Sequence, residues 1–536
     1  MKNIQTYISI VALFFLAAGC TKDFIDTNSN PYKVTDESLK QDYNNIGGFF
    51  QQLQLNIYLY DGLQTQTNLT GDAFSQYMVP PTPFGGNINN VTYYYRWVGD
   101  QWNNAYNKTM TVLLNFKNNK VDVNYPHFYA WATVLKIFTM QRTTDYYGPI
   151  IYSNYGSTST EIDYDSQKDV YYSFFTELNT AIDTLTKYAD ANNKAFKNFD
   201  LAFGGDISKW VKVANSLRLR LAIRISNVDP VKAKAEAEKA IVQKYGVIEN
   251  NSDNLYITSN QGHALGMISW DWGDTRMSAT MESVMKGYND PRMSIDFAPV
   301  NSSTAGAPED KTVTAGDYKG IRQGIDISSK DIYVGYSPVG TRFQTAKKLQ
   351  IMTASEVYLI RAEGLLRGWN MGVKTVKEFY EAGVKASFDQ LGANGYDVYI
   401  NDATSTFANY VDTHNAVNNF SASSNVTIKW DDSADNEHKL EKILTQKWIA
   451  MYPDGQEAWS EFRRTGYPKL VPVVVNYSGG EIITSDFVRR VKYPSSEYDN
   501  NNAAVVKASA TLTGTNGVSG DKGGSRVWWD TAKPNF

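Results

Sequence analysis

The chain has 536 residues, of which 42% are hydrophobic and 20% are charged, so it is long enough to bury a large core in one or two domains. Its formal net charge of −4 at pH 7 argues against nucleic acid as a partner, because a polyanion attracts basic surfaces. With a single cysteine the chain has no intrachain disulfide framework, so packing must stabilise the fold.

The N-terminal region predicts a cleaved export signal followed by a lipidated tether. Lys2 supplies a positive charge, residues 7–16 form an apolar run too short to span a bilayer, and small residues lead to Cys20. A bacterial lipoprotein signal has its lipid acceptor at this position, so we predict a signal peptide over 1–19, lipidation of Cys20 and a tether over 20–38. Ordinary secretory cleavage is the alternative. No later segment reaches about 18 consecutive apolar residues, so the N-terminal lipid is the expected membrane attachment.

Hydrophobic periodicity predicts a mainly α-helical body after the tether. Ser166 begins a capping box, Ser208 precedes an apolar helical run, and Pro230 suits the first turn of a helix. Helices are expected over 39–60, 99–118, 126–145, 167–188, 207–226, 230–244, 275–287, 353–368, 373–390, 435–451 and 456–463. Stretches rich in Gly, Asn, Ser and Thr separate them, and we expect these to be ordered loops with short strands that carry binding residues. These stretches are 61–96, 251–274, 297–345, 394–432 and 471–535.

Aromatic residues make up 13% of the chain, with 12 Trp, 36 Tyr and 24 Phe. Many of them must belong to the core, but Tyr and Trp also suit ligand sites, because a flat apolar face lies beside a hydrogen-bonding tip. Two aromatic clusters outside the helical faces are the candidate ligand site: Tyr94, Trp97, Trp102 and Asn103 in the first, and Trp270, Trp272 and Arg276 in the second. If the second cluster is extended, its two indoles project to one side. The alternative for each ring is that it only packs a loop against the helical scaffold and does not contact a ligand.

Five charged residues on predicted helices are interpreted as scaffold ion pairs. Arg218 lies off the apolar face of its helix and needs a carboxylate partner or solvent. Glu457 and Glu461 share a helix face with Arg463 and Arg464 nearby, which indicates an ion-pair network. The alternative is that Glu457 and Glu461 are the two catalytic carboxylates of a glycosidase. Glycosidase carboxylates approach a sugar from opposite sides, however, and neighbours on one helix cannot do so. No catalytic residue is therefore assigned.

Metal and cofactor signals are weak. The four histidines, His127, His263, His414 and His438, have no paired ligand spacing, and the chain has no nucleophile elbow or phosphate-loop lysine. Asp163 and Asp165 resemble the start of a calcium loop, but Lys168 and Phe174 stand where glycine and the bidentate glutamate belong. We expect no cofactor and no metal.

Several short sequence words resemble the SusD/RagB family of nutrient-binding outer-membrane lipoproteins, especially its SusD-like branch. They occur in order through nearly the whole mature chain. The words are CTKDFIDTNSNP (20–31), TDYYGPIIYS (144–153), YDSQKDVY (164–171), GDISKW (205–210), ANSLRLRLA (214–222), DPRM (290–293), IMTASEVY (351–358), RAE (361–363), QKWIA (446–450), EAW (457–459) and RRTGYP (463–468).

This resemblance implies a single domain over 39–536, built on four tetratricopeptide-like helix pairs with a loop-rich half that has short strands. It also implies a non-catalytic lipoprotein that is exposed at the surface of the outer membrane and captures a glycan or peptide. The resemblance further implies that this lipoprotein forms the lid of a SusC-like TonB-dependent barrel. In this family the loop before an early helix often contributes Trp and Asn to the ligand site, which supports Trp97, Trp102 and Asn103 as candidates. Two alternatives stay open, a tetratricopeptide-like protein-binding adaptor and a surface glycoside hydrolase, and the choice between glycan and peptide is also open.

Overall fold

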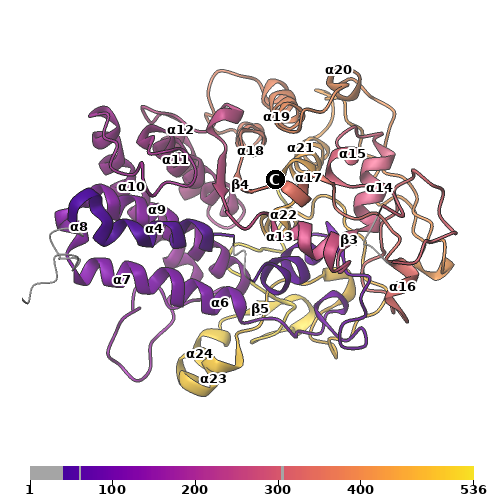
Figure 1. Ribbon diagram of the computed structural model, residues 1–536, viewed down its shortest axis with the longest axis horizontal. Coiled ribbons are helices and arrows are strands. Elements are labelled where there is room, and N and C mark those ends of the chain that lie inside the picture. Colours follow the sequence, from indigo (N-terminus) through magenta and orange to yellow (C-terminus); the bar gives the residue numbers. More distant parts are fainter. Residues whose placement is uncertain (1–39, 59–61, 303–306) are drawn as a thin grey trace, which may run out of the picture. The chain divides into compact units, whose positions relative to one another are not determined.

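The computed structural model describes residues 40–58, 62–302 and 307–536. The predicted signal peptide, the lipidation site Cys20 and the tether lie outside these residues. Internal contacts divide the chain into residues 1–48 and 49–536, and the second unit holds nearly all of the described elements. Within that unit helices predominate and strands are few and short, as Figure 1 shows.

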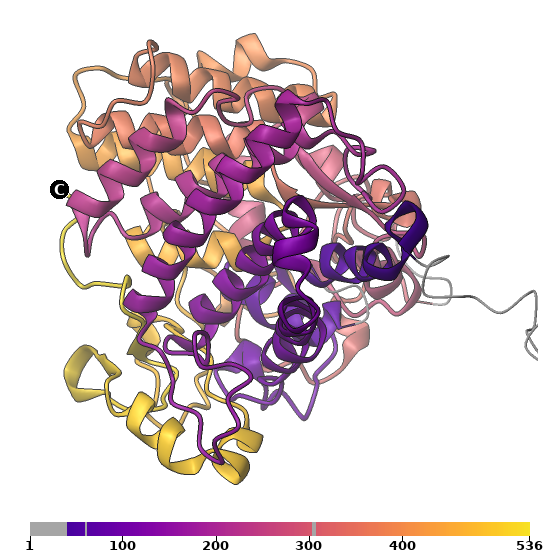
Figure 2. The same cartoon turned by 90° about the vertical axis from the view of Figure 1, so that its left-hand side faces the viewer.

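Four successive helix pairs form the scaffold among the described residues. They are α9 (Pro126–Tyr147) with α10 (Gln167–Asp190), α11 (Ile207–Arg224) with α12 (Pro230–Ile241), α18 (Ala354–Leu366) with α19 (Val376–Leu391), and α21 (Asn436–Met451) with α22 (Gly455–Thr465). Contacts of α10 with α11, α11 with α18 and α18 with α21 join the pairs to one another. In Figure 2 the purple and magenta helices α9 to α12 lie side by side. The predicted mainly helical fold with tetratricopeptide-like pairs is confirmed.

Local capping explains where these helices begin. Ser166 accepts a hydrogen bond from the Asp169 amide at 3.2 Å, and Pro230 occupies the first turn of α12 as predicted. Helix α11 begins at Ile207, as predicted, and the carboxylate of Asp206 accepts both the amide (3.0 Å) and the hydroxyl (2.6 Å) of Ser208. The Asp206 carboxylate is therefore the N-cap, and Ser208 lies inside the first turn.

The remaining helices have 13 residues or fewer. The early ones are α4 (Asn44–Asn56), η2 (Leu63–Gly71), α5 (Asp72–Phe74), η3 (Asn90–Thr92), α6 (Asp100–Ala105), η4 (Tyr106–Met110), α7 (Thr111–Asn118) and α8 (Val121–Asn124). The middle ones are η5 (Asn251–Asp253), α13 (Ala264–Gly266), η6 (Met267–Asp271), α14 (Ala279–Gly287), α15 (Met293–Asp296), α16 (Lys330–Tyr333), α17 (Arg342–Thr345) and α20 (Tyr396–Ile400). The late ones are η7 (Ala416–Asn418), η8 (Thr484–Asp486), α23 (Ser495–Asn500), α24 (Asn502–Ser509) and η9 (Thr515–Gly517). The first predicted loop, 61–96, thus begins with helical turns.

The strands of the described chain form three two-stranded antiparallel sheets. They pair β1 (Met78–Val79) with β3 (Arg276–Met277), β2 (Leu255–Thr258) with β4 (Lys348–Met352), and β5 (Thr513–Gly514) with β6 (Ser525–Arg526). In the first sheet Met78 lies opposite Met277 and Val79 opposite Arg276. This register joins the loop after β1 to the loop before β3.

Aromatic rings fill much of the core between the helix pairs. The fully buried Trp131 of α9 stacks on Phe196 with ring centroids 4.3 Å apart and meets Trp210 of α11 at 5.3 Å. Stacked and edge-to-face rings of this kind stabilise a core beyond the area that they bury. A large share of the aromatic content therefore belongs to the scaffold.

Candidate functional site

The first aromatic cluster lies in the loop between η3 and α6. Tyr94 is 47% exposed, and Trp97 is half-buried with its ring edge-to-face against Phe84 at 5.8 Å. The side chain of Asn90 holds this loop, because it accepts from the Arg96 amide at 2.8 Å and donates to the Trp97 carbonyl at 3.2 Å. The loop therefore presents two aromatic rings on a hydrogen-bonded base.

The second aromatic cluster is helical and not extended. Trp270 lies in the π-helical turn η6 and is half-buried, with its Nε1 donating to the Val339 carbonyl at 3.0 Å. Trp272 is 44% exposed, and its carbonyl accepts from Lys330 Nζ at 2.5 Å. The alternating arrangement that an extended segment would produce is absent, so Trp272 is the more accessible of the two indoles.

The pairing of β1 with β3 brings the two clusters to one part of the molecule. Thr82 follows β1 and donates to Asp274 Oδ1 at 2.5 Å, and Asp274 precedes β3. Lys330 Nζ reaches the same Asp274 oxygen at 2.8 Å. The loop that carries the first cluster is thereby tied to the loop that carries Trp272.

Helix η2 links the same two loops through consecutive side chains. Gln64 Nε2 donates to Asp274 Oδ2 at 3.4 Å, and the Thr65 hydroxyl donates to the carboxylate of Asp100, next to Trp97. A small cavity lined by Thr65, Trp97 and Asp100, among others, lies at this point. η2 is a π-helix, a rare conformation that occurs frequently at functional sites.

We call this region the aromatic surface. It comprises Gln64, Thr65, Phe84, Tyr94, Trp97, Asp100, Trp272, Asp274 and Lys330. Its exposed indole and phenol rings lie near carboxylate, amide, hydroxyl and ammonium groups, which is the combination that a polar ligand with an apolar face requires. Six of these residues were not candidates from sequence, because contacts across the fold reveal them and no local motif does: Gln64, Thr65, Phe84, Asp100, Asp274 and Lys330.

Four of the predicted ligand residues are not part of the aromatic surface: Trp270, described above, and Trp102, Arg276 and Asn103. Trp102 is 3% exposed, its Nε1 donates to Glu497 Oε1 at 2.9 Å, and its ring stacks on Tyr164 at 5.8 Å. Arg276 is fully buried and donates to three main-chain carbonyls, and burial lowers the pKa of its guanidinium to about 9. Asn103 is exposed on α6. Trp102 and Arg276 therefore hold elements together, and their side chains are buried.

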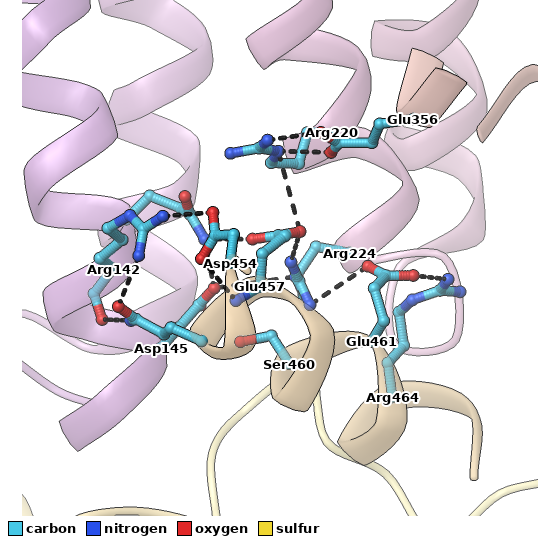
Figure 3. Close-up of polar contacts among 12 residues, drawn as sticks. Arg142, Asp145, Arg220, Arg224, Glu356, Asp454, Glu457, Ser460, Glu461 and Arg464 are labelled. Atoms are coloured by element: carbon cyan, nitrogen blue, oxygen red, sulfur yellow. Dashed lines mark hydrogen bonds and ion pairs between the residues drawn. The ribbon is translucent and has the colours of Figure 1, made fainter. Parts of the chain in front are cut away.

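The carboxylates of Glu457 and Glu461 lie in a buried ionic network on α22, drawn in Figure 3. Glu457 pairs with Arg224, while Glu461 Oε2 lies 2.6 Å from Arg464 Nη2 and 3.3 Å from Lys447 Nζ. Burial raises the pKa of the Glu461 carboxyl, but Arg464, Lys447 and Arg224 lower it more, so the net shift of the pKa is downward. Neither carboxylate is open to solvent, and a general acid needs a raised pKa, so this pair lacks the properties of a glycosidase dyad.

Arg463 and Arg218 have other surroundings. Arg463 donates to the main-chain carbonyls of Asp145 (2.7 Å) and Arg489 (2.9 Å), and its guanidinium lies 3.5 Å from the centroid of the Trp459 ring. Arg463 was predicted to belong to the carboxylate network, but it lies outside that network. Its guanidinium donates to main-chain carbonyls and packs on an indole ring instead. Arg218 lies 3.5 Å from Glu236 Oε2, which supplies its carboxylate.

Neither a metal cluster nor a membrane span is found within the described ranges. No group of three or more His, Cys, Asp or Glu side chains there is arranged to hold a metal ion. The carboxylate of Asp165 accepts from the amides of Tyr152 and Ser153, both at 2.9 Å, and Asp163 pairs with Lys507 at 2.9 Å. None of the helices described is long and apolar enough to cross a bilayer.

Comparisons with known proteins identify the family. Residues 26–530 match the SusD-like family, described as SusD and RagB outer membrane lipoproteins. A chitin-binding SusD homologue from Flavobacterium johnsoniae is 46% identical with a TM-score of 0.86, over 92% of this chain and 100% of that one. A SusD-like protein from Bacteroides thetaiotaomicron is 33% identical (TM-score 0.83, 91% and 99%), and a SusD homologue from Bacteroides uniformis is 34% identical (TM-score 0.82, 91% and 99%). A comparison with curated proteins finds no match. The chain is therefore a member of the SusD-like family of outer-membrane lipoproteins.

Proposed function

We propose that this protein captures a glycan at the cell surface without catalysing a reaction and delivers it to a SusC-like TonB-dependent barrel. The aromatic surface carries this proposal. Trp97 and Trp272 come from segments about 175 residues apart, and Gln64 and Thr65 join those segments into one site. Family membership supports the assignment to nutrient binding.

The chemistry of the aromatic surface suits a pyranose chain. The apolar C–H face of a sugar ring stacks on an exposed indole, and its hydroxyl groups donate to carboxylates such as Asp100 and Asp274. The amide of Gln64 and the ammonium of Lys330 supply donors for sugar oxygens. Because the Flavobacterium johnsoniae relative binds chitin, a β-linked N-acetylglucosamine oligosaccharide is the first substrate to test.

The buried carboxylates argue against the hydrolase alternative. Glu457 and Glu461 are ionised by neighbouring cations and are closed to solvent, so they offer no acid to a glycosidic oxygen. A protein-binding adaptor would use the exposed rings at a protein interface and would bind no free glycan, so glycan binding distinguishes capture from this alternative. We therefore assign capture, with the lipid on Cys20 and the tether over 20–38 as the membrane attachment.

A binding screen tests this function. The mature chain in detergent is titrated by calorimetry with N-acetylchitotetraose, other tetrasaccharides and a peptide panel, and each mixture is then examined for products by chromatography. We expect selective binding of a glycan with no product. Release of shorter sugars would contradict the non-catalytic assignment, and selective binding of peptides would contradict the glycan assignment.

A further inference from the structure

A cavity of about 690 Å³ lies between the first turn of α10 and the C-terminal segment 511–532. Its walls include Gln167, Lys168, Leu512, Arg526, Trp528 and Asp530. It shares no residue with the aromatic surface. Its volume is within the range of about 300–1,000 Å³ that is typical of small-molecule sites.

The fold builds this cavity from three elements. The pairing of β5 with β6 sets Thr513 opposite Arg526, so that Leu512 and Val527 line the same wall. The opposite wall is the N-terminus of α10, where Ser166 caps the helix. Arg526 is held in place, since its Nη1 donates to Asp530 Oδ1 at 2.6 Å and its Nη2 donates to Asp486 Oδ1 at 2.6 Å.

An indole and two aliphatic side chains give the cavity its apolar part. Trp528 is half-buried, its ring meets Tyr171 at 6.1 Å, and no described residue accepts a hydrogen bond from its Nε1. Leu512 and Val527 are buried beside it. Trp528 is thus held from one side and open to the cavity, as a stacking platform must be.

The polar groups of the wall are left with unused hydrogen-bonding capacity. Gln167 is 2% exposed and Asp530 is 3% exposed, yet Gln167 Oε1 and Asp530 Oδ2 have no hydrogen-bond partner among the described residues. Buried acceptors without a partner are costly, so their presence in a cavity wall indicates a ligand or water that donates to them. Lys168 is exposed and forms no ion pair with the described residues, and its Nζ lies 5.4 Å from the centroid of the Tyr172 ring, so its ammonium provides a hydrogen-bond donor at the rim.

This mixture of groups selects one ligand class. An anion would meet the carboxylate of Asp530, and a purely apolar ligand would leave Gln167 and Asp530 unsatisfied. Arg526 and Asp530 form an ion pair 2.6 Å apart and neutralise each other. The remaining charge is that of Lys168, which is exposed at the rim and screened by solvent, so the inner wall has no net charge that requires an ionic ligand. A polyhydroxylated ring has an apolar face for Trp528 and hydroxyl groups that both donate and accept.

We propose that this cavity is a second carbohydrate-binding pocket, in which a neutral pyranose unit stacks on Trp528 and donates hydroxyl hydrogen bonds to Gln167 and Asp530. The pocket is separate from the aromatic surface, so its occupancy does not depend on the proposed capture site. The ligand is a segment of a neutral oligosaccharide.

The test isolates the pocket by removing the other site. The mature chain carrying Trp97→Ala and Trp272→Ala is titrated in detergent with N-acetylchitotetraose, cellotetraose and maltotetraose. We expect at least one of these sugars to bind with a stoichiometry of one, and Trp528→Ala to lower that affinity about tenfold or more, because it removes the stacking face. Trp528→Phe should restore most of the affinity.

Controls separate pocket loss from misfolding. Thr513→Trp fills the cavity from its exposed rim without removing a core contact, so it should abolish binding in a chain with an unchanged melting temperature. Tyr477→Ala removes an exposed aromatic ring outside the cavity and should leave the affinity unchanged. If none of the three sugars binds, or if Thr513→Trp binds as the parent does, the proposal is wrong. Failure of the capture proposal is distinguishable, because it is measured by the effect of Trp97→Ala and Trp272→Ala on the otherwise unaltered chain.

Discussion

Replacing Trp272 with alanine is the sharpest perturbation of the aromatic surface. The indole is 44% exposed and belongs to a loop held by main-chain and Asp274 contacts that the substitution leaves in place. We therefore expect the Trp272→Ala variant to fold with nearly unchanged stability and to lose ligand affinity.

The exposed area of the ring sets the size of the effect. A tryptophan presents up to about 250 Å², and 44% of that area leaves about 110 Å² of Trp272 open to solvent. A sugar ring that stacks on one face covers about half of this, and at about 25 cal/mol per Å² the contact contributes about 1.4 kcal/mol. The expected consequence is a dissociation constant about tenfold higher.

Calorimetric titration with N-acetylchitotetraose measures this change, and Trp102→Ala is the matched control. Trp102 is 3% exposed and is hydrogen-bonded to Glu497, so its removal should cost about 3–5 kcal/mol of unfolding free energy in urea. If Trp272→Ala binds as tightly as the parent chain, the aromatic surface is not the ligand site. A stable Trp102→Ala variant with weakened binding would likewise refute the reasoning.

Three further predictions concern the scaffold and the anchor. Arg224→Met should lower the unfolding free energy in urea by about 3–5 kcal/mol and leave ligand affinity unchanged, because it removes the cation that pairs with the buried carboxylate of Glu457. A loss of unfolding free energy below about 1 kcal/mol would contradict this prediction. Burial raises the pKa of Asp72 from 3.8 to about 8, so the folded state binds a proton that the unfolded state releases, and the stability from this group falls as pH rises from about 4 to about 8. Asp72→Asn should therefore gain stability over the parent at pH 8 relative to pH 5, and an equal difference at both values would refute it. Cys20→Ser should move the protein from the membrane fraction to the soluble fraction, whereas retention would exclude the lipid as sole attachment.

Local sequence signals are sufficient for much of the scaffold. Asp229 and Pro230 mark the start of α12, and Ser166 marks the start of α10, because a cap depends on residues within three positions of it. The predicted range 207–226 also begins where α11 begins, although Asp206 and Ser208 are both good capping residues and the cap is the carboxylate of Asp206. Short π-helical turns such as η2 have no signal of this kind.

The sequence by itself determined the helical periodicity and, through ordered words, the family of the protein. It also predicts a lipoprotein-type N-terminus, which lies outside the described residues. Only the tertiary structure decided that Trp102 is buried while Trp272 is exposed, since an indole suits both a core and a surface. It also decided the pairing of Gln64 with Asp274, which are 210 residues apart, and that of Arg224 with Glu457, which are 233 apart. The physical reason is that caps and periodicity depend on neighbours along the chain, whereas burial and ion pairing depend on which helix pairs pack together.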